Sequence, residues 1–286
     1  MAAIIDLPDF MFKGKKISYS KFEKIYITIF GLFIGFIHKN TNKKLFCFIL
    51  NFFFSKDGKI FYHEKFYGKK MWNNNILYFP NKRIDRVILD HKNHLKLIFD
   101  TYCLDEIDFN LGDNVIDCGA NVGELLFSLK LNNIDCNYIG FEPDPANFKA
   151  LEKNTKPFNV SIYENALSYV DEKRMFYLNT EGGDSSLIYF GDEKSIELNT
   201  KTLDSFKYNK IKLLKIEAEG AELEVLQGST NTLKNVEYIT VDYGPERGIT
   251  NDPTSAEIID FLYQNNFRMI KASRHRDVGL FKNTTF

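Results

Sequence analysis

One ten-residue stretch, Asn114 to Gly123, constrains the fold of this 286-residue chain more than any other. It reads as a short buried strand, a glycine-bearing turn and then a helix from Glu124 to Leu131. A Cβ at Gly119 or Gly123 would intrude on a bulky ligand, so both glycines let the backbone approach one. Nineteen residues beyond Gly123, a second apolar strand ends in Glu142. The stretch therefore predicts a nucleotide-binding strand–helix–strand unit whose terminal acid accepts hydrogen bonds from ribose hydroxyls.

The turn is acidic, which limits the nucleotides it suits. A dinucleotide fingerprint would place three glycines after the strand, and this turn lacks the triple. Asp117 instead stands two residues before Gly119, where its carboxylate would repel a pyrophosphate and attract a cation. S-adenosylmethionine carries an ammonium and a sulfonium and no phosphate, so we infer that this methyl donor is the cofactor. In the alternative interpretation, Asp117 only caps the turn and Glu142 is a surface acid.

Charge is divided unevenly along the chain. Residues 1–100 hold 18 Lys or Arg and 8 Asp or Glu, whereas residues 101–286 hold 19 and 30. A nucleic-acid-binding enzyme would carry basic residues around its active site, so we expect no nucleic-acid partner. The basic first part fits an acidic membrane surface or an anionic glycan, and equally a solvated basic face.

The cysteines point to a reducing compartment. Cys47, Cys103, Cys118 and Cys136 have no C-x-x-C spacing and no adjacent histidine. We expect them to be reduced and buried in a cytoplasmic protein rather than part of a disulfide framework or zinc site. Acidic strand ends could bind a divalent metal, but no ligand triad stands out, so we assign no metal site. Acidic residues and a proline interrupt the first ten residues, so no secretory signal is expected.

Residues 1–72 are expected to form an N-terminal extension. Ile25 to Ile37 is an apolar run of 13 residues, and a second run extends from Leu45 to Phe54. Neither reaches the ~20 residues that span a bilayer. We expect two helices or strands packed on the rest of the protein. The alternative is a peripheral contact of residues 25–54 with a membrane surface.

Residues 73–110 read as a lead-in, with short strands at Ile76–Phe79 and Val87–Leu89, and with His91 and His94 on a helix surface. From 111 to 286, strands and helices alternate, which predicts a parallel sheet. The further strands expected are Val160–Tyr163, Arg174–Leu178, Ile211–Ile216, Val236–Val241, Phe267–Ala272 and Val278–Phe281, and the further helices Pro145–Asn154, Ala221–Leu226 and Ser255–Gln264. Gly182 to Ser186 reads as a flexible loop.

An ordered series of motifs across residues 100–282 resembles the FkbM-type S-adenosylmethionine-dependent methyltransferases. The matching pieces are Val115–Gly123, Gly140–Pro145, Asn165–Leu167, Thr202–Asp204, Leu214–Glu222 and Val241–Gly248. Where the family commonly has Asp-Val-Glu-Gly after the fourth strand, this chain has Glu217-Ala-Glu-Gly220. The series is more specific than any single motif.

The resemblance implies an α/β protein with the Rossmann-like class I methyltransferase fold. Its sheet would have seven mostly parallel strands, with the last strand antiparallel. The resemblance also implies methyl transfer to a hydroxyl of a small molecule or glycan, usually a sugar or another secondary metabolite. It indicates no oligomeric state.

The site residues follow from where the strands end, because ligands of open parallel sheets bind at the carboxyl ends. The expected cofactor residues are Asp117, Gly119, Asn121 and Gly123 near the methionine part, Glu142 on the ribose, Asn165 and Ala166 at the adenine edge, and Phe141 or Pro143 over the adenine face. Ordinary turn chemistry is the alternative for Asn165.

Methyl transfer to a sugar hydroxyl needs an acceptor held in line with the methyl group and a general base. We expect the base to be Glu217, with Asp242 and His275 as further candidates. In the alternative, Glu217 or Glu219 holds the cofactor amino group or caps the next helix. Arg274 to Arg276 would then be a solvated basic turn or would bind an anionic acceptor.

Two other functions remain as hypotheses. One is a non-catalytic nucleotide-binding relative, against which the intact Asp117, Gly119, Gly123 and Glu142 argue. The other is an NAD-dependent oxidoreductase, which would need the glycine triple that the turn lacks.

Overall fold

The computed structural model describes residues 21–179, 184–191 and 194–286. Residues 1–20, where we expected no secretory signal, lie outside the described residues, as do Gly182 and Gly183 of the expected loop. The chain divides into two compact units between His94 and Leu95. This division falls inside the segment 73–110 that the sequence indicates as a lead-in.

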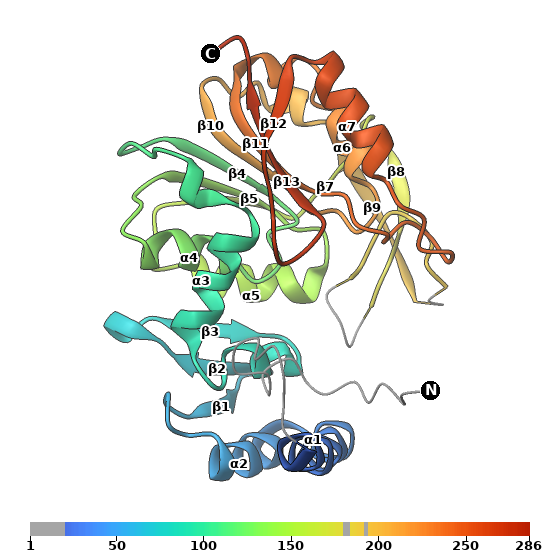
Figure 1. The fold of residues 1–286 in the computed structure, drawn as a ribbon. Helices are drawn as coiled ribbons and strands as arrows, with labels where there is room; N and C mark the ends of the chain where they lie inside the picture. The colour runs from blue at the N-terminus through green and yellow to red at the C-terminus, as the bar shows by residue number, and fades with distance from the viewer. Residues whose placement is uncertain (1–20, 180–183, 192–193) are drawn as a thin grey trace. The chain divides into compact units, whose positions relative to one another are not determined.

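The N-terminal unit contains two helices and a small antiparallel sheet. The two apolar runs form α1 (Lys21–Asn40) and α2 (Lys43–Phe53), which lie side by side and are blue in Figure 1. The sheet consists of β1 (Ile60–His63), β2 (Phe66–Lys70) and β3 (Ile76–Phe79) in that order. Within residues 21–179, 184–191 and 194–286, no helix has both the length and the apolar character needed to cross a membrane.

Two predictions for the lead-in were wrong, and the ion pair of Lys69 with Asp57 explains both. Val87 ends a 3-10 helix that begins at Lys82, and the carbonyl oxygens of Val87 and Ile88 accept hydrogen bonds from Nζ of Lys69, so no strand forms there. The same Nζ lies 2.7 Å from Oδ2 of Asp57, which also accepts a hydrogen bond from the backbone N–H of His91. His91 is therefore buried at the start of α3 (His91–Thr101) rather than exposed.

The second unit is built on a seven-stranded sheet in the order β12-β13-β11-β10-β4-β5-β6. Its strands are β4 (Asn114–Cys118), β5 (Asn137–Phe141), β6 (Ser161–Tyr163), β10 (Ile211–Ile216), β11 (Val236–Asp242), β12 (Phe267–Ala272) and β13 (Val278–Asn283). Neighbouring strands from β6 to β11 are parallel, and β13 is antiparallel to both of its neighbours. The predicted seven-stranded sheet with an antiparallel last strand is confirmed.

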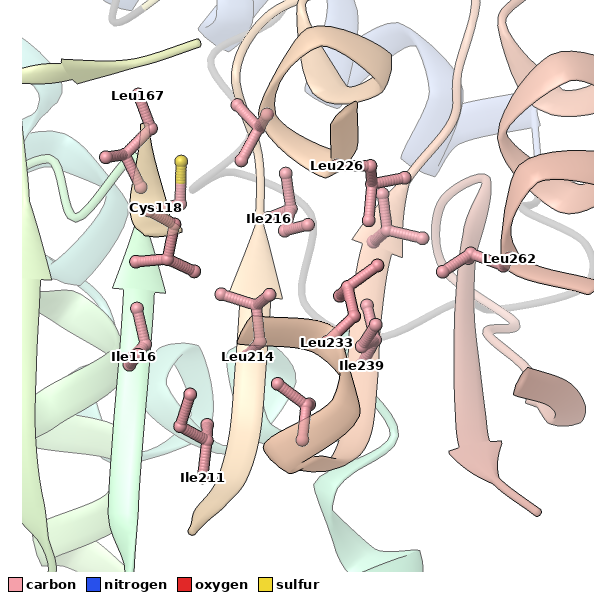
Figure 2. Close-up of a cluster of buried hydrophobic side chains, with 14 of the residues drawn as sticks. Ile116, Cys118, Leu167, Ile211, Leu214, Ile216, Leu226, Leu233, Ile239 and Leu262 are labelled. Carbon is pink, nitrogen blue, oxygen red and sulfur yellow. The ribbon is translucent and has the colours of Figure 1, made fainter. Parts of the chain in front are cut away.

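Helices cover both faces of this sheet. The part of α3 from Leu95 on lies on one face with α4 (Glu124–Leu131) and α5 (Pro145–Thr155), and α6 (Glu222–Gln227) and α7 (Ser255–Gln264) lie on the other (Figure 1). Alternate strand residues face α6 and α7, because side chains of a strand alternate between faces. Figure 2 shows this core, with Ile116, Cys118, Leu214, Ile216, Ile239, Leu226 and Leu262. Asp144 caps α5 by accepting from two backbone N–H groups, and Pro145 follows in the first turn as predicted.

A second, three-stranded sheet follows β6 in the sequence. It consists of β7 (Ala166–Leu167), β9 (Ser195–Lys201) and β8 (Lys173–Tyr177), with β9 in the middle. The sequence predicted β8 but not β9. The signal was present, since Ile196 and Leu198 alternate with polar residues as in a half-buried strand.

Candidate functional site

The turn after β4 is shaped by contacts inside the protein. Gly119 has a φ of 77°, and a Cβ built there would lie 1.9 Å from the carbonyl oxygen of Glu217. Gly123 has a φ of 90°, and its Cβ would lie 2.9 Å from Cδ1 of Leu151 in α5. Gly119 is therefore required by the packing of the chain on itself and Gly123 by its left-handed backbone, reasons different from the ligand approach that the sequence suggested.

A polar row crosses four strands at one level of the sheet. The register pairs Asp117 of β4 with Gly140 of β5 and with Lys215 of β10. It also pairs Lys215 with Thr240 of β11. Residues paired in register point to the same face of a sheet, so strand pairing alone brings a carboxylate and an ammonium together.

Lys215 is an enclosed cation that joins β10 to the glycine turn. Its Nζ lies 3.0 Å from Oδ1 of Asp117 and 3.2 Å from Oε2 of Glu217, and its side chain is 3% exposed. The same Nζ donates to the carbonyl oxygens of Cys118 (3.2 Å) and Gly119 (2.8 Å). Burial alone would lower the pKa of Lys215, but its anionic neighbours hold that pKa well above the usual value.

Asp117 is held from a second side by Tyr138 of β5. Oη of Tyr138 donates to Oδ2 of Asp117 over 2.6 Å. A Cβ at Gly140 would lie 3.0 Å from Cε1 of Tyr138 and 3.4 Å from its Oη, so Gly140 leaves the space through which the phenol reaches the carboxylate. Burial raises the pKa of Asp117 despite the ion pair with Lys215. The carboxylate is thus bound inside the protein and holds the strand ends together.

Glu217, which follows β10, is bound by two cations and a phenol. Its Oε1 lies 2.6 Å from Nη1 of Arg276, and its Oε2 is the second partner of Lys215. The hydroxyl of Tyr102 donates to the same Oε2. Burial would raise the pKa of Glu217, but Lys215 and Arg276 hold it well below the usual range. Glu217 is therefore ionised at neutral pH and a weak proton acceptor.

Arg276, in the loop between β12 and β13, brings three acids together. Besides Glu217, it binds Asp242 and Glu246, with Nη2 at 2.8 Å from Oδ2 of Asp242 and 3.0 Å from Oε1 of Glu246. Burial raises the pKa of Asp242, and Arg276 partly opposes this. Burial and the nearby Asp242 raise the pKa of Glu246 to about 7. Glu246 is thus a carboxyl that exchanges a proton near neutral pH.

The turn from β10 to α6 carries a further acid. Glu219 has a φ of 51°, a left-handed conformation that is uncommon outside glycine. The carboxylate of Glu222 fixes this turn by accepting from the backbone N–H groups of Ala218 (2.7 Å) and Gly220 (3.2 Å). Burial and the charge of Glu217 raise the pKa of Glu219 to about 10, so its carboxyl is protonated and can donate a hydrogen bond.

Glu142 lies directly after β5, with a side chain closed off from solvent. It is 5% exposed, and its Oε2 accepts from the backbone N–H of Asn121 over 2.7 Å. Its Oε1 accepts from the N–H of Asp144 over 2.8 Å. Burial raises the pKa of Glu142 to about 8, although both hydrogen bonds oppose the shift. The structure therefore joins Glu142 to the turn after β4, as the nucleotide-binding unit requires.

The expected adenine residues have different surroundings. Pro143 is half-buried beside Glu142. Asn165 donates to the carbonyl oxygen of Asn199 over 3.5 Å, and Ala166 pairs with Thr200 in β7 and is buried. Phe141 is fully buried with its ring 5.0 Å from that of Tyr163, which favours Pro143 over Phe141 as the residue expected at the adenine face.

The remaining predicted residues lie in two loops. His275 is exposed, and its backbone N–H donates to Oγ of Ser273 over 3.2 Å. Ser185 donates to Oδ2 of Asp144 over 2.9 Å, and Ser186 donates to the carbonyl oxygen of Glu219 over 2.7 Å. Residues 184–186 therefore contact the ends of both β5 and β10.

Sequence reasoning missed the cations and phenols of this site. Lys215 had a signal, because a lysine inside the apolar strand Ile211–Ile216 must find an acidic partner when the strand is buried. In the sequence, Arg276 is marked only as one residue of a basic turn. Tyr102 and Tyr138 had no signal beyond their residue type.

The residues at this edge fit a cofactor that has ribose hydroxyls and positive charge. Glu142 retains lone pairs for hydroxyl donors, and the surrounding side chains are mostly acidic and offer few partners to a phosphate. Among the residues that the structure describes, no group of three or more His, Cys, Asp or Glu side chains is placed to hold a metal ion.

Comparison with known proteins gives concordant matches. The family model for the methyltransferase FkbM domain matches residues 117–269, more than half of the chain. Methyltransferase 1 of Beauveria bassiana is 26% identical over 161 residues, which are 46% of this chain and 65% of that protein. The hexuronic acid methyltransferase AglP of Haloferax volcanii is 26% identical over 144 residues, 46% of this chain and 56% of that protein. The chain thus spans less than two thirds of the length of these curated relatives.

Among solved structures, a methyltransferase FkbM from Methylobacillus flagellatus KT aligns with a TM-score of 0.46 and 13% identity. The alignment covers 70% of this chain and 53% of that chain.

Proposed function

Since the chain belongs to the family of FkbM methyltransferase domains, we propose that it is an S-adenosylmethionine-dependent O-methyltransferase acting on a hydroxyl of a sugar or glycan. The observation that carries the cofactor assignment is the buried carboxyl of Glu142, which is bound to the backbone of the glycine turn at Asn121. Ribose hydroxyls would donate to this carboxyl, and Asp117, Gly119 and Gly123 would shape the turn beside the methionine part.

Calorimetry with S-adenosylhomocysteine and S-adenosylmethionine tests the assignment. We expect micromolar binding by the wild type and a loss of at least tenfold in Glu142→Ala. Glu152→Ala is the matched control, because it removes an exposed acid from the nearby helix α5. Absence of binding by a folded wild type at millimolar cofactor, or equal binding by Glu142→Ala, would refute the proposal.

The bound cofactor supplies a methyl group on a positively charged sulfur, which is open to direct displacement. The residues of the chain must then hold the acceptor hydroxyl in line and receive its proton. We propose that Glu217, Lys215 and Arg276 act as a fixed charged frame at the ends of β10 and β13. Arg276 orients Asp242 and Glu246 through its second guanidinium nitrogen.

Glu246 is the proton acceptor in this proposal. Its pKa of about 7 suits proton transfer near neutral pH, and its contact with Arg276 keeps it beside Asp242. Asp242 and the exposed His275 are the other candidates, whereas the lowered pKa of Glu217 makes it the weakest base of the group.

A pH–rate profile separates these assignments once labelled methyl transfer to a glycan panel has identified an acceptor. Glu246→Gln should lower kcat by about 10²–10⁴-fold and leave affinity for S-adenosylhomocysteine unchanged. Glu197→Gln, an exposed acid of β9, is the control. If Glu246→Gln keeps the wild-type kcat and pH profile, Asp242 or His275 takes the proton instead.

The acceptor class rests on chemistry and on one relative. The protein from Haloferax volcanii is named as a hexuronic acid methyltransferase, which favours a sugar acceptor for this chain. We place the enzyme in the cytoplasm, because Cys47, Cys103, Cys118 and Cys136 are all buried free thiols. A non-catalytic relative would bind S-adenosylmethionine without forming S-adenosylhomocysteine with any acceptor.

A further inference from the structure

The two helices of the N-terminal unit expose large apolar side chains. Ten of these side chains are between 40% and 86% exposed. They are Phe22, Ile25, Ile29, Leu32, Phe33 and Phe36 in α1, and Leu45, Phe48, Phe52 and Phe53 in α2. Isolated exposed apolar residues are ordinary, but a contiguous group of this size marks an interaction surface.

These residues form one row on each helix. In α1 the exposed residues follow a spacing of three and four, from Phe22 through Ile29 to Phe36, which places them on one face. In α2, Leu45, Phe48 and Phe52 follow the same spacing. Each helix also has a buried apolar face, which includes Ile34 and Ile37 in α1 and Phe46, Cys47 and Leu50 in α2. The exposed rows are therefore a second apolar face, additional to the one that packs in the core.

The two rows meet where the helices touch. The ring of Phe33 in α1 lies 5.5 Å from that of Phe53 in α2, and both side chains are partly exposed. Phe30 packs against Phe53 and Phe54 at 5.9 Å beneath this contact. The two blue helices of Figure 1 thus present one surface, which we call the α1–α2 face: the ten exposed residues from Phe22 to Phe53.

The charge along these two helices is mostly basic. Residues 21–56 contain six lysines and one acid, Glu23. Lys39 at the end of α1 and Lys43 and Lys44 at the start of α2 are exposed, and Lys56 follows α2. The lysines therefore lie at the helix ends and border the apolar rows.

We propose that the α1–α2 face binds the interfacial layer of an anionic lipid bilayer, with its aromatic and aliphatic side chains among the acyl chains and its lysines on the headgroups. Apolar rows on helices with flanking lysines have the chemistry of an interfacial membrane contact. A second copy of the chain is disfavoured as the partner. A self-complementary interface would bring together the lysines of both copies, and residues 21–56 offer only one acid to six lysines.

Vesicle flotation tests the proposal with the full chain. The face variant combines Phe36→Ser, Phe48→Ser and Phe52→Ser. The matched triple combines Leu111→Ser, Ile249→Ser and Phe286→Ser, whose side chains in the other unit are 85%, 65% and 58% exposed. The vesicles contain phosphatidylcholine alone or with 30% phosphatidylglycerol. Because every substituted side chain is exposed, circular dichroism should show both variants folded.

We expect the wild type and the matched triple to float with the anionic vesicles. The face variant should bind at least tenfold more weakly, and pure phosphatidylcholine or 1 M NaCl should weaken wild-type binding. Equal flotation of both variants would overturn the proposal. Failure of the wild type to float would also overturn it. Light scattering would then distinguish the other occupants: a dimer that the face variant loses would show that a second copy covers the face, and a monomer would show that the chain itself does.

Discussion

The substitution Glu142→Gln tests whether the folded protein raises the pKa of this carboxyl. The wild-type carboxyl has a pKa of about 8 in the folded protein, against an ordinary value of 4.5. Between these values the unfolded chain has lost the proton that the folded protein retains. Stability therefore falls as the pH rises through this window, since the folded state binds more protons.

The size of the effect follows from the width of the window. Each pH unit corresponds to about 1.4 kcal/mol, so this carboxyl should remove about 4 kcal/mol of folding stability between pH 5 and pH 8. A glutamine at position 142 does not titrate. It also loses one of the two hydrogen bonds from Asn121 and Asp144, because its NH2 group cannot accept, but that loss is the same at both pH values.

The assay is urea unfolding of wild type and Glu142→Gln at pH 5 and pH 8, without cofactor. Between pH 5 and pH 8, the unfolding free energy of the wild type should fall by about 4 kcal/mol relative to that of the variant. The variant should at the same time bind S-adenosylhomocysteine more weakly. A shift below about 1 kcal/mol would refute the reasoning, because Glu142 would then titrate alike in the folded and unfolded chain.

Two further substitutions test the polar row in the same unfolding assay. Lys215→Met should cost about 3–5 kcal/mol, because it leaves the buried carboxylate of Asp117 without a cation and Glu217 with Arg276 alone. Lys215→Met combined with Asp117→Asn should cost less than the sum of the single changes. Additive costs would contradict the ion pair. Gly140→Ala should cost about 1.5–3 kcal/mol by displacing Tyr138 from Asp117. The cost should be lower in a Tyr138→Phe background, which keeps the ring contact but has no hydrogen bond to lose; equal costs in both would contradict this contact.

The large elements were readable because hydrophobic periodicity and caps are local. Helix α4 has the predicted bounds, and α5 begins at Pro145 after the Asp144 cap. The seven mostly parallel strands followed from the family resemblance, and the antiparallel last strand is present as β13. Two missed features depended on distant residues: the Lys69 amine that holds Val87 in a turn, and His91 buried on Asp57.

The candidate site was predictable by position and not by partner. Strand ends identified Asp117, Glu142, Glu217 and Asp242, because position along a parallel strand follows from local sequence. Whether each acid is free or bound depends on cations far away in the chain, such as Arg276, which is 59 residues from Glu217. Sequence spacing contains no information on that pairing. The preference for Glu217 as base was reasonable by position, and the two bound cations are the reason to favour Glu246.

The charge balance at the sheet edge leads to a last prediction. Four acids, Asp117, Glu217, Asp242 and Glu246, share two cations, Lys215 and Arg276. A cationic ligand at this edge should lower the pKa of Glu246 from about 7 and release protons. S-adenosylhomocysteine lacks the sulfonium charge, so its binding should release fewer protons at pH 7 than that of S-adenosylmethionine. Calorimetry in buffers of different ionisation enthalpy measures this number directly. Equal proton release for both ligands would mean that the sulfonium does not approach these acids, and the acceptor base would then have to be sought elsewhere along the sheet edge.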